Sequence, residues 1–142
     1  MKTLKFEENV KVFGMRVPNF PYGISDAFDA LTNMLPPGDD RPFYGISECT
    51  QDEVVYIAAA LETFEGEAER YRCNTYFIEK GEYLSATIKD WPSKIPAIKE
   101  TIGGLLEDER ADATKPCVEV YKSMNEMLCL VKVKQATKEE VH

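Results

Sequence analysis

The sequence predicts an α+β domain made of two βαββ modules in tandem, related by a pseudo-two-fold axis. The first observation is that the order strand, helix, proline-opened strand, turn and strand occurs twice along the 142 residues. The second is that Pro42 and Pro116, which open equivalent strands, lie 116 − 42 = 74 positions apart. The third is that the same offset matches Gly45 to Glu119. A cleft between two such halves is a natural site for a ligand.

Length and charge limit the classes of protein that this chain can be. It has the size of one domain, residues 1–134, with halves of about 1–65 and 66–134, and a charged, flexible tail at 135–142. The net charge of −8 argues against nucleic acid or an anionic membrane surface as the partner. Neither a secretion signal nor a run of 18 apolar residues occurs, so we expect a cytoplasmic protein with reduced thiols.

The elements of the first half follow from periodicity and turn residues. Ser25 is a suitable N-cap for a helix that the Pro-Pro-Gly sequence at 36–38 ends. The acidic residues 62–69 predict an exposed connection. Three segments are rich in β-forming residues and predict strands: residues 10–17, 43–47 and 54–61.

The second half repeats this order. A helix is predicted around Pro96, which suits a first turn, because apolar residues follow at helical spacing as far as Leu105. Four segments predict strands: residues 75–78, 82–88, 117–121 and 126–133.

One predicted strand of the second half carries the most informative residue. Because side chains alternate across a strand, Cys117, Glu119 and Tyr121 share one face, and Val118 and Val120 share the other. The valines would pack into a core, which leaves the glutamate on a partly buried face where an unanswered charge costs free energy. Burial raises the pKa of such a carboxyl, and a bound organic cation would lower it again. The same group could serve as a general base on water, or lie idle at the rim of the sheet.

Aromatic residues are the other candidates for binding, because their faces attract cations and stack on planar ligands. Trp91 is favoured since it stands beside Pro92 at a strand-to-helix junction, outside any apolar stripe. Gly45 is also a candidate, because a glycine inside a strand marks either a bulge or a close approach. The preferred aromatic candidates are Tyr121 and Trp91, then Tyr44 and Tyr22. The full set, which could equally build the core, is Phe20, Tyr22, Tyr44, Tyr56, Tyr83, Trp91 and Tyr121.

Metal and cofactor chemistry finds little support in the sequence. The only histidine is His142, and the four cysteines show no CxxC spacing, so we expect no zinc site. No Ser/His/Asp or Cys/His arrangement is available, and no phosphate-binding glycine loop follows a strand. We therefore expect neither a metal nor a cofactor.

Three motifs follow one another along the chain: PFYGIS at 42–47, KGEY at 80–83 and PCVEVY at 116–121. In order and spacing they resemble the gyrase-inhibitor-like (GyrI-like) effector-binding family over about residues 4–134. The resemblance implies a twisted antiparallel sheet with two main helices and a pocket between the halves. It also implies that Glu119 answers cationic, aromatic ligands and that Tyr121 forms a wall of the pocket.

The family contains ligand-binding domains of multidrug-responsive transcription regulators and their stand-alone relatives. No helix-turn-helix region precedes this domain, so the chain resembles a stand-alone member. Such members inhibit gyrase, sequester drugs or hydrolyse strained cyclopropane-containing compounds, and the resemblance does not choose among these. We expect first a small-molecule-binding protein acting in sensing or sequestration. The alternative is a hydrolase with Glu119 as general base and Tyr121 as acid or orienting group. The third is an inhibitor of gyrase, whose partner would be a topoisomerase or a regulator.

Overall fold

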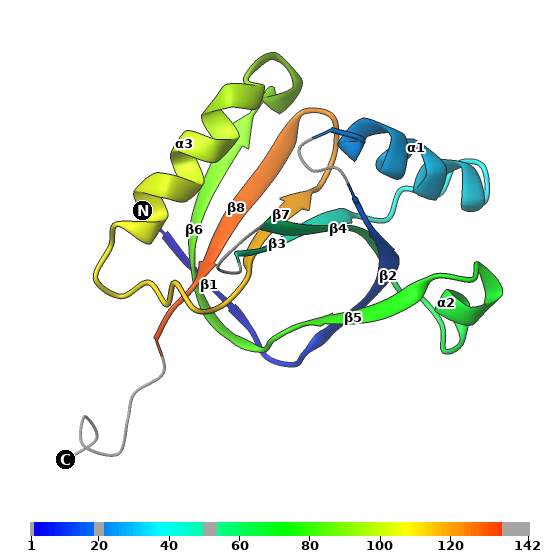
Figure 1. Ribbon diagram of the computed structural model, residues 1–142, viewed down its shortest axis with the longest axis horizontal. Coiled ribbons are helices and arrows are strands. Elements are labelled where there is room, and N and C mark those ends of the chain that lie inside the picture. The colour runs from blue at the N-terminus through cyan, green and yellow to red at the C-terminus, as the bar shows by residue number, and fades with distance from the viewer. Residues whose placement is uncertain (1, 19–21, 50–53, 135–142) are drawn as a thin grey trace.

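The computed structural model of this chain describes residues 2–18, 22–49 and 54–134 (Figure 1). The predicted tail at 135–142 lies outside the described residues. No helix in the described ranges has the length and apolar character needed to cross a membrane. The elements in chain order are β1 (Lys2–Phe6), β2 (Val10–Arg16), α1 (Ile24–Met34), β3 (Phe43–Cys49), β4 (Val54–Leu61), α2 (Glu67–Arg70), β5 (Asn74–Ile78), β6 (Gly81–Lys89), the 3-10 turn η1 (Trp91–Ser93), α3 (Ile95–Leu106), β7 (Cys117–Tyr121) and β8 (Glu126–Lys132).

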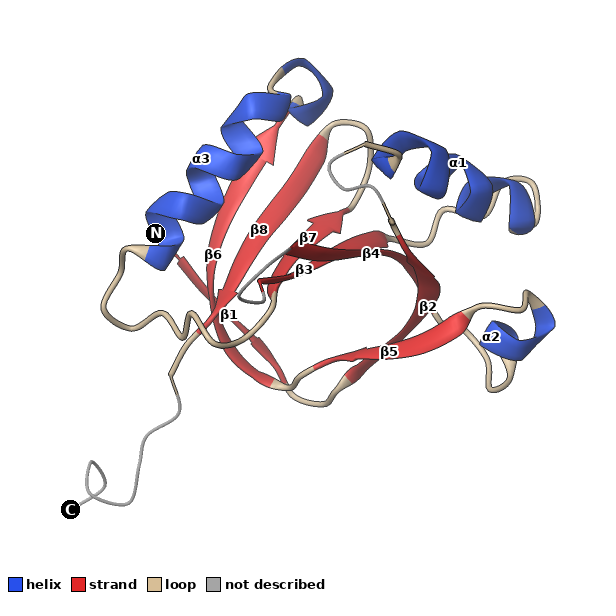
Figure 2. Cartoon of the chain, viewed as in Figure 1, coloured by secondary structure: helices blue, strands red, loops and turns tan. Residues whose placement is uncertain are grey.

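In the described part of the chain, eight antiparallel strands form one curled sheet in the order β1-β6-β8-β7-β3-β4-β2-β5. The helices lie on its outer face, and the strands wrap around an interior (Figure 2). The α+β class is therefore confirmed. The strands β3 and β7 pair at the middle of the sheet, with β4, β2 and β5 on one side and β8, β6 and β1 on the other. Beyond the predicted elements, the structure adds β1, which pairs with β6, and the short helix α2.

The core follows the two faces of the sheet. The interior is filled by one apolar cluster that includes Val118 and Val120. On the outer face, one cluster packs under α1 and α2 around Phe13, and another packs under α3. Cys117 and Tyr121 belong to the cluster under α3, so the predicted alternation across β7 is confirmed.

The segment 62–69 differs from the sequence prediction, which made it an exposed connection. Glu67, the first residue of α2, is fully buried. Its Oε1 accepts hydrogen bonds from Nη1 of Arg41 at 2.7 Å and from the backbone amide of Thr63 at 2.8 Å. The prediction is wrong at Glu67, because Arg41, 26 positions away, supplies the charge that permits burial of the carboxylate.

The start of α1 also differs from the prediction. The helix begins at Ile24, and its N-cap is Gly23, whose φ is 88°. No side chain caps this end, so the predicted role of Ser25 is wrong. A left-handed residue is needed where the chain enters the helix, and glycine adopts that conformation without strain.

Candidate functional site

Glu119 lies at the centre of the sheet. In register, it is opposite Gly45 of β3 on one side and Cys129 of β8 on the other. Because Val118 and Val120 face the interior, its side chain points to the outer face, where the helices pack. Only 8% of its surface is exposed.

Two tyrosine hydroxyls donate hydrogen bonds to the carboxyl group of Glu119. Tyr56 of β4 donates to Oε1 at 2.8 Å, and Tyr121 donates to the same oxygen at 2.6 Å. No described lysine or arginine forms an ion pair with Glu119. Nor do the described residues contain a cluster of three or more His, Cys, Asp or Glu side chains that could hold a metal ion. The carboxyl group is therefore hydrogen-bonded by neutral donors alone.

Gly45 provides the space for this arrangement. A Cβ atom at Gly45 would overlap the hydroxyl oxygen of Tyr56 and would lie 2.6 Å from Oε1 of Glu119. The strand β3 pairs with β4 and β7 without interruption, so Gly45 does not mark a bulge. The groups that come close to Gly45 are side chains of the protein itself, where the sequence predicts, as the alternative to a bulge, the approach of a ligand or of backbone.

Burial sets the electrostatics of the site. Loss of solvent raises the pKa of the Glu119 carboxyl, and the hydrogen bonds from Tyr121 and Tyr56 offset this only in part. Burial first, and the charge of Glu119 second, raise the pKa of both tyrosine hydroxyls. The hydroxyls therefore remain protonated donors. The carboxyl group holds its proton more tightly than in water, unless a positive charge arrives beside it.

Two aromatic rings pack against Tyr121, one of the residues that donate to Glu119. The ring of Tyr121 lies edge-on to Phe28 of α1, with centroids 5.5 Å apart, and to Trp91 of η1, with centroids 4.9 Å apart. The indole nitrogen of Trp91 donates to the carbonyl of Ser123 at 2.8 Å, which fixes the ring over the end of β7. All three rings are half-buried. They form a cluster, the aromatic cover (Phe28, Trp91 and Tyr121), which contacts the carboxyl group through the Tyr121 hydroxyl.

The structure brings only some of the predicted residues together. Gly45, Trp91 and Tyr121 join Glu119 on the outer face. Tyr44 and Tyr83 do not, because both belong to the interior cluster on the opposite face of the sheet. Tyr44 adjoins Gly45 in sequence and must point the other way. Tyr83 donates to the carbonyl of Glu79 at 2.6 Å. Tyr22 is 78% exposed, and Phe20 lies outside the described residues.

The sequence predicts Tyr56 only as one of seven aromatic candidates, and it does not predict Phe28. Tyr56 pairs in register with Ser47, two positions beyond Gly45, and its hydroxyl reaches diagonally over the glycine. The glycine was the available signal, because it leaves room beside Glu119 for a polar group from a neighbouring strand. The pairing of β3 with β4 then identifies Tyr56.

The site at Glu119 is covered in this structure. A cavity of about 300 Å³ exists elsewhere, and Glu119 is not among the residues that line it. Nearly all of the Glu119 surface is covered by protein, and Tyr121 of the aromatic cover contacts its carboxyl group.

Neither a family model nor a curated protein sequence matches this chain. Solved structures do share its fold. An integron cassette protein from the mobile metagenome of Vibrio cholerae has a TM-score of 0.67 at 14% identity, over 94% of this chain and 95% of that one. The structure of SAV2435 bound to tetraphenylphosphonium has a TM-score of 0.68 at 11% identity, over 99% and 96%. A hydrolase from Listeria innocua has a TM-score of 0.57 at 13% identity, over 94% and 91%. At such identities these matches show a common fold alone.

Proposed function

We propose that this chain is a small-molecule-binding protein of the GyrI-like type, acting in sensing or sequestration, and that its ligand is a hydrophobic aromatic cation. One observation carries the proposal: Glu119 is buried at the centre of the sheet, with neutral hydroxyl donors and no cation from the described protein beside it. Burial of a carboxylate in that position costs free energy, and attraction to a ligand cation can offset this cost. Two unit charges about 4 Å apart attract by about 4 kcal/mol at an effective dielectric constant near 20.

The aromatic cover supplies the second half of the ligand site. A cation over an aromatic face gains about 0.5–2 kcal/mol, and an aromatic ligand also buries apolar surface. In the proposed complex the ligand takes the place of the Tyr121 ring between Phe28 and Trp91, so it lies directly above Glu119. Tyr56, which is buried beneath, keeps its hydrogen bond to the carboxylate. The cover is thus a closed state that the ligand opens.

Two further observations support this proposal. A structural neighbour was solved with tetraphenylphosphonium, which is a hydrophobic aromatic cation. The strand order also suits two βαββ modules within one domain of residues 1–134, since β2-α1-β3-β4 and β6-α3-β7-β8 meet at the β3–β7 pair. In that arrangement Gly45 and Glu119 are equivalent positions, and the glycine of one module gives room to the carboxyl group of the other.

Tetraphenylphosphonium itself is the probe that tests the proposal. Trp91, the only tryptophan of the chain, lies 4.9 Å from the Tyr121 ring and should report binding through its fluorescence. We expect saturable binding to the native protein and at least about tenfold weaker binding to Glu119→Gln, which corresponds to about 1.4 kcal/mol. Triphenylphosphine oxide, which is neutral and of similar shape, should bind both proteins equally weakly.

The matched control is Glu100→Gln, which removes the same charge from an exposed position on α3. Its affinity for the cation should equal that of the native chain. Equal affinity of the native protein and Glu119→Gln would remove Glu119 from the site. If Glu100→Gln weakened cation binding as much as Glu119→Gln does, the effect would come from the overall negative charge of the protein and not from the site.

Hydrolysis is the second candidate function, and the same site favours it. A carboxyl group with a raised pKa and two tyrosine hydroxyls provide a base and proton donors for adding water to an electrophilic small molecule. One structural neighbour is a hydrolase. Mass spectrometry of a cyclopropane-containing electrophile incubated with the protein would show a product that has gained one water. Glu119→Gln should abolish that product, while saturable binding without product leaves only the binding function.

A further inference from the structure

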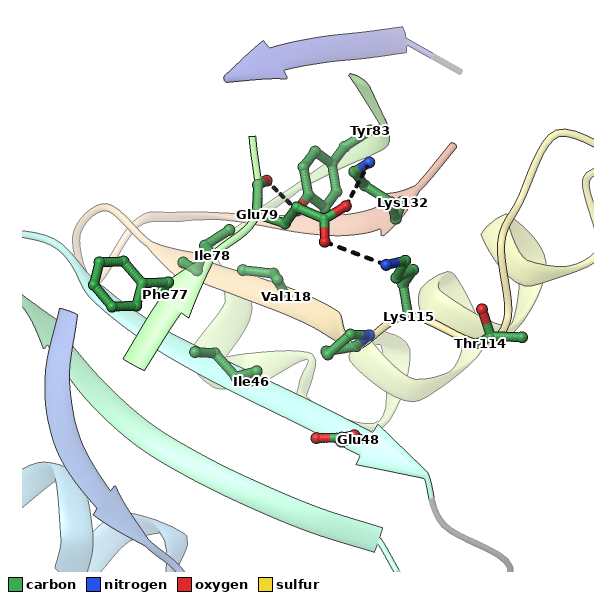
Figure 3. A pocket seen from close by; sticks show the side chains of 11 residues that line it. Ile46, Glu48, Phe77, Ile78, Glu79, Tyr83, Thr114, Lys115, Val118 and Lys132 are labelled. Carbon is green, nitrogen blue, oxygen red and sulfur yellow. Dashed lines mark hydrogen bonds and ion pairs between the residues drawn. The ribbon is translucent and has the colours of Figure 1, made fainter. Parts of the chain in front are cut away.

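A second candidate site lies on the interior face of the sheet, at the open end of the curl. It is a cavity of about 300 Å³, bounded by the ends of β3, β5 and β8 and by the starts of β6 and β7 (Figure 3). This volume is at the lower end of the range for small-molecule pockets, and the mouths of curled sheets are common places for them. Glu119 points to the opposite face, so the two sites are separated by the sheet.

The polar part of the cavity has two ammonium groups and one carboxylate between them. Oε1 of Glu79 lies 3.1 Å from Nζ of Lys132, and Oε2 lies 3.2 Å from Nζ of Lys115. Dashed lines in Figure 3 mark both ion pairs. Lys132 is 2% exposed, and its ammonium lies 5.7 Å from the ring centroid of Tyr83. The two lysines lower the pKa of Glu79. This trio, Glu79, Lys115 and Lys132, therefore carries one positive charge in excess.

Another part of the cavity wall is apolar. Ile46, Ile78 and Val118 line it and belong to the buried interior cluster. Phe77, another lining residue, precedes Ile78 on the edge strand β5 and is 60% exposed. Because Tyr76 and Ile78 belong to the interior cluster, alternation along β5 directs the Phe77 ring to the outer face. The buried apolar wall on the interior side suits the apolar body of a ligand.

We propose that this cavity binds a small amphipathic monoanion, a medium-chain or aromatic carboxylate. Its charged group contacts the ammonium groups of Lys115 and Lys132, and its body lies against Ile46, Ile78 and Val118. Glu79 is the internal competitor for the two lysines. Glu48, the other acidic residue of the lining, is exposed on β3, and its charge disfavours ligands with more than one negative charge. This site differs from the one at Glu119 in its face and in the sign of its ligand.

The probe for this site is 1-anilinonaphthalene-8-sulfonate, an aromatic monoanion whose fluorescence rises on binding. We expect a saturable signal that decanoate displaces and that decanol and decylammonium do not. Lys115→Glu should weaken binding at least about fivefold, because it reverses a charge at a position 40% exposed and leaves the core intact. Glu79→Gln should strengthen binding, because it removes the internal competitor from the lysines.

Two controls make the result decisive. Lys122→Glu reverses the charge of another exposed lysine, which pairs with Glu126 outside the cavity, and should leave the affinity unchanged. Glu119→Gln should also leave it unchanged, so failure of the cation site and failure of this site are separate outcomes. Displacement by decanol as strong as that by decanoate would overturn the proposal, as would equal weakening by Lys122→Glu. Lys132→Met tests the buried ammonium group in the same binding assay. If Lys132→Met does not fold, Lys115→Glu alone decides the proposal.

Discussion

Two buried glutamates of this protein, Glu67 and Glu119, differ in the groups that donate hydrogen bonds to their carboxyl oxygens. Glu67 is fully buried, and its Oε1 accepts hydrogen bonds from Arg41 and from the backbone amide and hydroxyl of Thr63. Glu119 is 8% exposed, and its Oε1 receives two tyrosine hydroxyls. Both are carboxyl groups taken out of water, but only the first has a cation of the described chain beside it.

The difference separates a structural carboxylate from a candidate functional one. Arg41 is itself held in place, because Asp39 binds its guanidinium at 2.7 Å and the ring of Phe13 lies 5.8 Å away. The cation of Glu67 is therefore a permanent part of the fold, and it fixes the chain just before β3. At Glu119 the hydroxyls stabilise a carboxyl group without neutralising it, and a visiting cation can complete the site.

Removal of the cation from the structural glutamate should have the largest effect. Arg41→Met leaves the carboxylate of Glu67 buried without a charge partner, and breaking such a pair costs about 3–5 kcal/mol. Urea unfolding at neutral pH would measure the loss. Arg110→Met, which removes an arginine with a 52% exposed side chain from its pair with Asp108, should change stability little. Equal losses for the two variants would contradict the contrast between a buried and an exposed pair.

Filling the space at Gly45 should have the next largest effect, and it acts on the candidate functional site. The Cβ atom of Gly45→Ala overlaps the Tyr56 hydroxyl, and overpacking of this kind costs about 1–3 kcal/mol. The variant should also lose the response to tetraphenylphosphonium, because the hydroxyl can no longer reach Glu119. Gly103→Ala is the matched control: no atom lies within 4 Å of its Cβ position in α3, so it should gain about 0.5–1 kcal/mol. A Gly45→Ala protein that is stable and still binds would show that the space is not needed.

The contrast between the two glutamates also shows what the sequence can and cannot predict. The outward position of Glu119 and its neighbour Tyr121 follows from alternation along one strand, which is a local property. The partner Tyr56 is 63 positions away, and Arg41 is 26 positions from Glu67. These contacts depend on strand pairing and on the packing of α2, which local periodicity does not determine. For this reason the sequence predicts an exposed segment at 62–69, and it does not single out Tyr56 as the partner of Glu119.

The same non-local pairing decided which aromatic residues could reach the site. Tyr44 and Tyr83 have the residue type that suits a cation site, but the pleat places them in the interior cluster. The strands that contain Tyr44 and Tyr83 can be predicted from the sequence. The face of the sheet on which each ring lies, relative to Glu119, depends on the register of β3 and β6 with their neighbouring strands. Trp91 and Phe28 come from helical elements on the outer face, and the curl of the sheet brings both to Tyr121.

The smallest expected effect is a change in the pH dependence of stability in Glu119→Gln. Burial raises the pKa of Glu119 in the folded protein above its ordinary value of 4.5, so the folded state holds this proton more tightly than the unfolded chain does. The stability that this proton contributes is fully present below about pH 4.5 and is lost as the pH rises through the folded-state pKa. Glutamine has no such proton. The difference in unfolding free energy between Glu119→Gln and the native protein should therefore grow with pH in that window, by at most about 1.4 kcal/mol per pH unit.

The slope of this difference is the diagnostic quantity, because its absolute level also includes the new amide group. The –NH₂ of glutamine replaces one carboxyl oxygen, and the free-energy change caused by that replacement is independent of pH. Urea unfolding from pH 4 to pH 8 would separate the two contributions, with Glu100→Gln as the parallel control on the exposed face of α3. A difference that stays constant over this range would mean that Glu119 titrates alike in both states. Glu119 would then be no more a carboxyl group in need of a cation than Glu67 is, and the contrast between the two would lose its functional meaning.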